Sequence, residues 1–206
     1  REVTRRTGRG WPTILLLGTA YGVIEAGLVD QSLFNPSFET WDFLAVTPIP
    51  ALGISAFHAM SFVVGHAIWS IGIPIALVEL LTPARRTTPW LGSVGLAVTG
   101  GLYLLGCVLI FRFMYRMEGF LASPWQWLGA ALVAAALIGL AFAVKPRPTA
   151  RTDRVVPGPR FLGVGTFLLF SLYAMRSESW GGVGLGVALL GGAAVLVVYW
   201  SRQEGW

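Results

Sequence analysis

Long apolar runs, separated by short polar connections, constrain the fold of this chain more than any other feature. A helix needs about 20 mostly apolar residues to cross the hydrocarbon core of a bilayer. The runs that could form membrane helices are 12–29, 51–81, 90–111, 125–144, 161–175 and 182–200. The second of these runs carries Pro74, where we expect a kink or a tilt in the helix, and the fifth run is the shortest. The sequence therefore predicts an all-α polytopic membrane helix bundle of about six transmembrane helices, built as one membrane domain over residues 1–206.

Composition supports a multipass protein of the cell membrane. Charged residues make up only 12% of the chain, against about 25% in soluble domains. The net charge of +5 does not indicate nucleic acid, because the basic residues lie in short connections and form no basic patch. The single cysteine, Cys107, excludes an internal disulfide and a cysteine-based zinc site. We expect no metal and no cofactor.

The distribution of arginine and lysine predicts the orientation. With the N-terminus in the cytoplasm, the inside segments hold 12 basic residues and the outside segments hold 3. The positive-inside rule then gives N-in and C-in. Residues 145–160 become a cytoplasmic linker, and the loop after the first helix is external, with Asp30, Glu39 and Asp42 but no basic residue.

The first run carries a carboxylate, Glu25, near its end. A charge at the centre of a membrane helix costs roughly 2.5–3.5 kcal/mol on insertion scales. Gly18, Gly22 and Ala26 form a small-residue stripe that is typical of close helix packing, and Glu25 lies on the same side. We therefore expect Glu25 to face protein. Its expected partners, in a pocket that opens outward with Asp30, are His58, Arg112, Arg116 and Arg176.

The second run contains both histidines, His58 and His66. They lie about 80° apart around a helix and about 12 Å apart along it, so they cannot hold one metal as an i, i+4 pair does. Phe62 and Trp69 lie in the sector between them, and Glu79 is expected to be solvated at the cytoplasmic end. Simpler interpretations stay open: Glu25 could be a counter-ion of Arg112, each histidine could bond a carbonyl, and the arginines could snorkel to headgroups.

Two stretches, YGVIEAGLVDQSLFNP and HAIWSIGIPIALVELLTP, resemble a family of uncharacterised bacterial multipass membrane proteins. The resemblance implies a membrane fold and no particular activity. A second, partial resemblance is to membrane proteases of the CAAX-processing type, because Phe62 and His66 fit the Phe-x-x-x-His motif of that family. The double glutamate, the arginine after it and the later histidine of those proteases have no counterpart in this chain.

Three functions remain compatible with these residues. The first is an intramembrane enzyme, a cyclase or isomerase, which acts by acid catalysis on a lipophilic, isoprenoid-type substrate and resembles membrane terpene cyclases in its chemistry. The second is a proton-coupled transporter or channel, which we expect to be a homodimer. The third is a structural or assembly subunit.

Besides membrane lipids, the enzyme needs a lipophilic small molecule as its partner. Its catalytic candidates are Glu25, His58 and His66, and its substrate-binding candidates are Asp30, Phe62, Trp69, Arg112, Tyr115 and Arg116.

Overall fold

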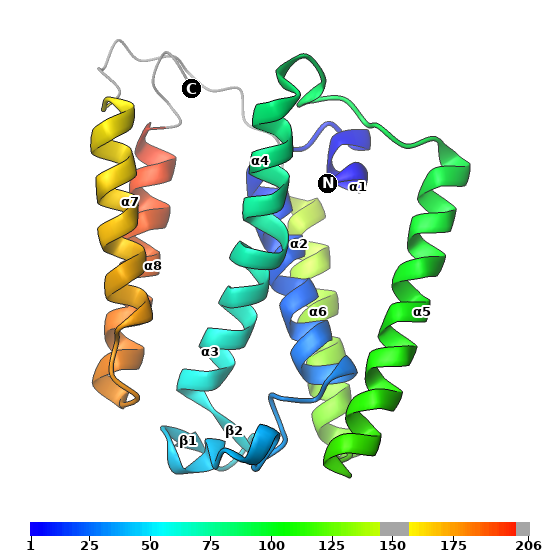
Figure 1. The fold of residues 1–206 in the computed structure, drawn as a ribbon, viewed down its shortest axis with the longest axis vertical. Coiled ribbons are helices and arrows are strands. Elements are labelled where there is room, and N and C mark those ends of the chain that lie inside the picture. The colour runs from blue at the N-terminus through cyan, green and yellow to red at the C-terminus, as the bar shows by residue number, and fades with distance from the viewer. Residues whose placement is uncertain (145–156, 201–206) are drawn as a thin grey trace. The chain divides into compact units, whose positions relative to one another are not determined.

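The computed structural model describes residues 1–144 and 157–200, in two compact units, Arg1–Pro146 and Arg147–Trp206. The first unit begins with a short helix, α1 (Glu2–Arg6). Four membrane-length helical segments follow (Figure 1). They are α2 (Trp11–Ile24) with its continuation η1 (Glu25–Val29); α3 (Ala56–Gly65), η4 (His66–Gly72) and α4 (Ile73–Leu81); α5 (Ser93–Glu118); and α6 (Pro124–Ala143).

The second unit is a pair of helices, α7 (Pro159–Ala174) and α8 (Trp180–Trp200). Helix α7 is shorter than the length that spans a bilayer, while α8 and the four segments of the first unit are long and apolar enough to do so. The described residues therefore confirm an all-α fold with five helices that are long and apolar enough to span a membrane. The six-helix count and the single-domain organisation over 1–206 stay predictions. Most of the predicted 145–160 linker lies outside the described residues.

Apolar side chains face outward over most of the first unit, as lipid-facing helices require. No residue of α5 is buried, although this helix has a mean hydropathy of 2.2 over its most apolar window. Large side chains such as Leu102, Leu104 and Val94 are each more than half exposed. In water such a surface would drive aggregation, whereas in a bilayer it meets acyl chains.

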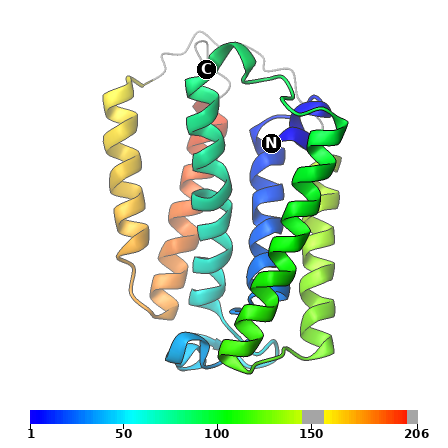
Figure 2. The ribbon, with the colours of Figure 1, turned by 45° about the vertical axis from the view of Figure 1, so that its right-hand side comes forward.

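The core of the first unit forms around α2, which packs against α3 and η4 on one face and against α6 on another (Figure 2). The predicted small-residue stripe makes this possible. A Cβ on Gly22 would lie 2.7 Å from the carbonyl oxygen of Val63, and one on Gly18 would lie 3.3 Å from that of Ala67. On the α6 side, Ala130 and Ala134 are buried against Val23. Small side chains thus let the backbones approach closely.

Two segments of this core are π-helical, with hydrogen bonds that reach back five residues. The Asp30 N–H donates to the Glu25 carbonyl at 2.9 Å, and the Ile73 N–H donates to the Ile68 carbonyl. The irregularity expected at Pro74 is the π-helical segment η4, which lies just before it, because the ring nitrogen of proline cannot donate a hydrogen bond. Such π-bulges occur often at functional sites, and here one begins at Glu25 and the other at His66.

The four long segments of the first unit alternate in direction. Helix α1 and the 82–92 connection lie at one end, and the 30–55 loop and the turn from α5 to α6 lie at the other (Figures 1 and 2). This alternation matches the predicted threading of the first four helices. Which end faces the cytoplasm stays a prediction from the positive-inside rule.

The boundaries of two helices differ from those expected. The second begins at Ala56 rather than at 51, because residues 48–55 form a small hairpin of β1 (Pro48–Ile49) and β2 (Ile54–Ser55). Ser55 then caps α3 by accepting the N–H of His58. The third runs on to Glu118, where Gly119, with φ of 63°, ends it in the left-handed conformation.

Candidate intramembrane site

Glu25 lies at the first position of η1 and is only 8% exposed. The groups that act on it electrostatically are the Asp30 carboxylate and the Tyr21 hydroxyl, which is one helical turn earlier. Within residues 1–144 and 157–200, no ion pair includes Glu25. The expectation that His58, Arg112 or Arg116 pairs with it is therefore wrong, and pairing with Arg176 of the second unit stays a prediction. Glu25 is a buried carboxyl in a membrane-spanning helix that lacks a cationic partner in this part of the chain.

Tyr21 links Glu25 to the neighbouring helices. Its ring meets the ring of His66 edge-on, with centroids 5.6 Å apart, and it lies 6.1 Å from the ring of Tyr103. Cys107, one turn further along α5, is the polar group beside the Tyr103 hydroxyl. We call Tyr21, Glu25, His66, Tyr103 and Cys107 the intramembrane polar cluster. It joins α2, η4 and α5.

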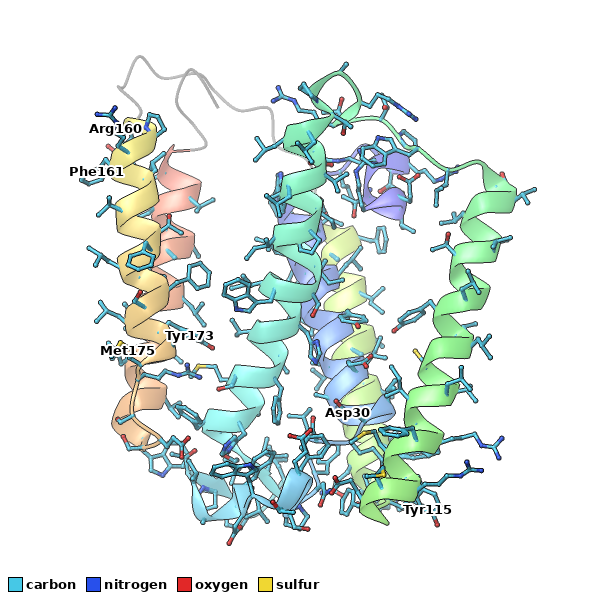
Figure 3. All side chains as sticks on the ribbon, in the orientation of Figure 1. Asp30, Tyr115, Arg160, Phe161, Tyr173 and Met175 are labelled. Carbon is cyan, nitrogen blue, oxygen red and sulfur yellow. The ribbon has the colours of Figure 1, made fainter. Side chains whose placement is uncertain are left out.

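Asp30 lies at the end of α2 nearest the loop, just beyond the membrane-spanning segment (Figure 3). Burial raises the pKa of its carboxyl above the usual range. Hydrogen bonds from Ser32 and the electrostatic interaction with the nearby His66 act on this pKa in the opposite direction. The Ser32 N–H donates to Asp30 Oδ1 at 2.9 Å. Because its charge also acts on Glu25 and Tyr21, Asp30 connects the polar cluster to the loop end of the bundle.

His58 belongs to a different group of side chains. Its Nδ1 lies 3.0 Å from Ser55 Oγ, and its ring stacks on Phe43 with centroids 4.1 Å apart. Phe62 packs against Phe38 and Phe43 in the same aromatic group. His58 thus lies in the first turn of α3, where it belongs to this aromatic group and not to the polar cluster around Glu25. His66, and not His58, is the histidine whose ring contacts the ring of Tyr21.

The remaining substrate-binding candidates are dispersed. Arg112 and Arg116 are exposed on α5, Trp69 is 63% exposed on η4, and Tyr115 is 49% exposed and stacks on Phe111. In the second unit, the Arg176 guanidinium lies over the ring of Tyr173 and donates to its carbonyl. Within the first unit, the structure thus joins Glu25, His66 and Asp30 and leaves the other candidates of that unit apart from them.

A hollow of about 510 Å³ lies between α2, α5 and α6, beside the polar cluster. Its volume falls within the roughly 300–1,000 Å³ usual for small-molecule sites. Tyr21, Ile24 and Tyr103 lie along its wall, and Arg1 and Glu2 lie along its rim. The other residues of its wall are Val3, Leu17, Ala20, Leu91, Leu96, Thr99, Gly100 and Ile138. We call this space the α2/α5 hollow.

A second open hollow, of about 630 Å³, lies on another face of α2, where Val23 is part of its wall. The hairpin, α3 and α6 supply most of the rest, and Ser123 and Gln126 are the polar side chains among the lining residues. Val23 and Tyr21 are two residues apart and point to nearly opposite sides of a helix. This hollow is therefore separated from the polar cluster by α2 itself.

Glu79, which the sequence suggested would be solvated, is 6% exposed. Its carboxylate accepts from Arg5 at 2.6 Å and from Arg1 at 3.0 Å. Glu2 in turn accepts the backbone N–H groups of Trp90 and Leu91. We call these contacts the ionic clamp. It holds α1 on the end of α4 and on the connection to α5.

Sequence reasoning missed two further buried groups at the loop end. Gln31 is 1% exposed, and its side-chain oxygen accepts from the Ala122 N–H at 2.7 Å and from the Trp127 indole at 3.2 Å. Asn35 donates to Glu118 at 3.1 Å. The clusters of turn-forming residues around them were visible in the sequence, but their partners lie more than 80 residues away along the chain.

Comparison with models of known families, with curated proteins and with solved structures finds no match for this chain. The two resemblances drawn from its residues therefore stay predictions.

Proposed function

We propose that the protein is a membrane-embedded enzyme, a cyclase or isomerase, which acts by acid catalysis on a lipophilic substrate in the α2/α5 hollow. The observation that carries the proposal is the buried Glu25 carboxyl without a cationic partner among the described residues, next to a tyrosine of the hollow's wall. An ionised carboxylate is costly in an apolar medium unless it is paired. Glu25 is therefore proposed to rest in its protonated form, which is the form that an acid catalyst needs.

The proposed reaction balances as an isomerisation. The Glu25 proton passes, directly or through the Tyr21 hydroxyl, to one carbon of a substrate double bond, which forms a C–H bond and leaves a cation on the other carbon. The rings of Tyr21 and Tyr103 line the hollow, and aromatic rings stabilise such a cation. Loss of a proton from an adjacent carbon, to the Glu25 carboxylate or to His66, forms a new double bond. The product is an isomer of the substrate, either cyclised or with a shifted double bond.

Transfer of solvent protons to lipid carbon tests the proposal and requires no identified substrate. Purified protein in neutral detergent is incubated with a total membrane lipid extract in D₂O buffer, and the lipids are analysed by mass spectrometry. We expect at least one lipid product that carries one deuterium on carbon with the wild type, and none with Glu25→Gln. Equal labelling by the two proteins, or no labelling by either, contradicts the proposal.

A proton-coupled transporter is the second candidate, and one observation favours it. Asp30, Glu25 and Tyr21 form a continuous series of titratable groups from the loop end into the membrane. Such a series suits proton transfer. Proteoliposomes with a trapped pH-sensitive dye measure it directly: a proton flux that Asp30→Asn and Glu25→Gln both abolish favours transport over lipid chemistry. Absence of both flux and labelling favours the structural or assembly role.

A further inference from the structure

The α2/α5 hollow has a charged end and an apolar length. Arg1 and Glu2 lie at the rim, while leucine, isoleucine and tyrosine side chains line the rest. Leu96 and Tyr103, both part of its wall on α5, are seven residues apart, which is about 10 Å along a helix. A molecule that fills this space therefore meets charge at one end and hydrocarbon along most of its length, as an amphiphile does.

Positive charge exceeds negative charge at the rim. The described residues around it include six arginines and only two carboxylates, Glu2 and Glu79. The ionic clamp uses both carboxylates for Arg1 and Arg5. The other four arginines, which have no carboxylate partner within residues 1–144 and 157–200, are Arg6, Arg9, Arg85 and Arg86.

Two of these arginines lie near the rim. Arg6 donates to the carbonyl of Leu91, which is a residue of the hollow's wall. The backbone carbonyl of Arg86 accepts from Arg1, whose side chain forms part of the rim, which places the Arg86 backbone there. Both Arg6 and Arg86 have exposed side chains. The hydrogen bond of Arg6 to a carbonyl oxygen leaves the charge of its guanidinium uncompensated, so an anion is attracted to this end.

We propose that the α2/α5 hollow binds a lipid with an anionic headgroup, which lies at the arginine-rich rim while its single hydrocarbon chain follows α2 toward Tyr21. This inference rests on the proposed function and specifies the substrate class. The substrate carries a phosphate or similar anion about 10 Å from its reacting double bond. Juxtamembrane arginines contribute about 1 kcal/mol each to the attraction of anionic lipid.

Binding of three defined probes tests the headgroup. Affinities are measured in neutral detergent for dodecyl phosphate, for dodecylphosphocholine, which has the same chain and a zwitterionic head, and for inorganic phosphate. We expect dodecyl phosphate to bind at least about fivefold more tightly than dodecylphosphocholine, which is the ratio for one basic residue. Equal binding of the two amphiphiles overturns the proposal. Inorganic phosphate that binds as tightly as dodecyl phosphate overturns it too, because it shows an anion site that needs no chain.

A matched pair of variants tests the hollow. Gly100 lies on its wall while Gly101 does not, and a Cβ on either glycine would meet no atom within 4 Å. Gly100→Leu should fill the hollow and weaken dodecyl phosphate binding at least tenfold, and Gly101→Leu should leave it unchanged. Both substitutions favour the helix, so both proteins should fold. Equal affinities for the two variants contradict the proposed place of the chain.

Two double variants test the arginines: one removes both positive charges, and the other keeps them. The double variant Arg6→Gln, Arg86→Gln should bind dodecyl phosphate at least tenfold more weakly, and Arg6→Lys, Arg86→Lys should recover most of the loss. An unchanged affinity in the glutamine variant overturns the role of the rim.

Failure of this inference is distinguishable from failure of the proposed function. If binding follows the expected pattern while Glu25→Gln still yields deuterated product, the lipid site stands and the acid catalysis fails. If Glu25→Gln abolishes labelling while the Gly100 and arginine variants bind normally, the catalysis stands and the lipid site fails.

Discussion

The ring of Tyr21 meets the ring of His66 edge-on at 5.6 Å, which shows the last turn of α2 packed beside the π-helical segment η4. Gly22 makes this approach possible, since the space a Cβ would need there is taken by Val63 and by the Cβ of His66. The consequence is a polar cluster across three helices, with Glu25 as its carboxyl group.

Replacement of Glu25 by glutamine should leave the stability of the protein nearly unchanged. Glutamine keeps the shape and the hydrogen bonding of a neutral carboxyl, and no arginine among the described residues loses its partner. Melting temperatures in detergent check this. A large fall that is restored by a second change, Arg112→Gln, would show that Glu25 is a structural counter-ion.

Replacement of Glu79 by glutamine should have the opposite effect and lower the melting temperature clearly. Glu79 is buried between Arg1 and Arg5, and the loss of one partner of a buried ion pair costs about 3–5 kcal/mol. Glu25→Gln is the matched control, since it makes the same chemical change in another helix. Equal melting temperatures for the two variants would contradict the distinction between paired and unpaired carboxyls.

Gly22→Ala should destabilise the bundle by about 1–3 kcal/mol, the usual range for overpacking. The new Cβ would lie 2.7 Å from a backbone oxygen, which cannot rotate away. Gly65→Ala is the control, because a Cβ there would meet no atom within 4 Å. Unfolding in detergent and denaturant measures both variants, and a Gly22→Ala protein as stable as Gly65→Ala would refute this packing.

The Asp30→Asn variant should gain stability relative to the wild type as pH rises. The pKa of Asp30 is raised in the folded state by burial. The contribution of this carboxyl to stability is therefore fully present below its ordinary value of 3.8 and is lost as pH rises through the folded pKa. Melting temperatures should be similar in acid, and the variant should melt higher near neutrality.

Glu2→Gln serves as a control because its effect on stability should depend on pH in the opposite direction. Burial opposes ionisation of Glu2, but hydrogen bonds from the Leu91 and Trp90 N–H groups and from Arg1 outweigh it and lower its pKa. Its contribution to stability is present above the ordinary value of 4.5 and is lost as pH falls through the folded pKa. This variant should melt below the wild type near neutrality and approach it in acid. The same sign for both variants would contradict the assigned environments.

Features that depend on residues nearby in the same helix could be predicted from the sequence. Gly18 and Gly22 of the small-residue stripe pack closely against α3 and η4 as expected, and Ala26 is fully buried, because three small residues at this spacing share a face in any helix. The irregularity before Pro74 also followed from local chemistry.

Features that depend on distant partners were not predictable in this way. Gln31 is buried only because the turn between α5 and α6 supplies its donors. Glu79 is buried only because α1 folds back over α4. The expected start of the second helix at 51 was wrong because the apolar residues from 51 onward continue the helical pattern, while the backbone forms a hairpin there.

The ionic clamp also bears on how the chain enters the membrane during synthesis. Arg5 is made before the first spanning segment, and Glu79 is made only at the end of the second. The two residues meet only when the 30–55 loop has been moved to the opposite side of the bilayer. Their bond thus marks the completed insertion of the first helical hairpin, and it opposes reversal of that hairpin while the later helices are still being translated.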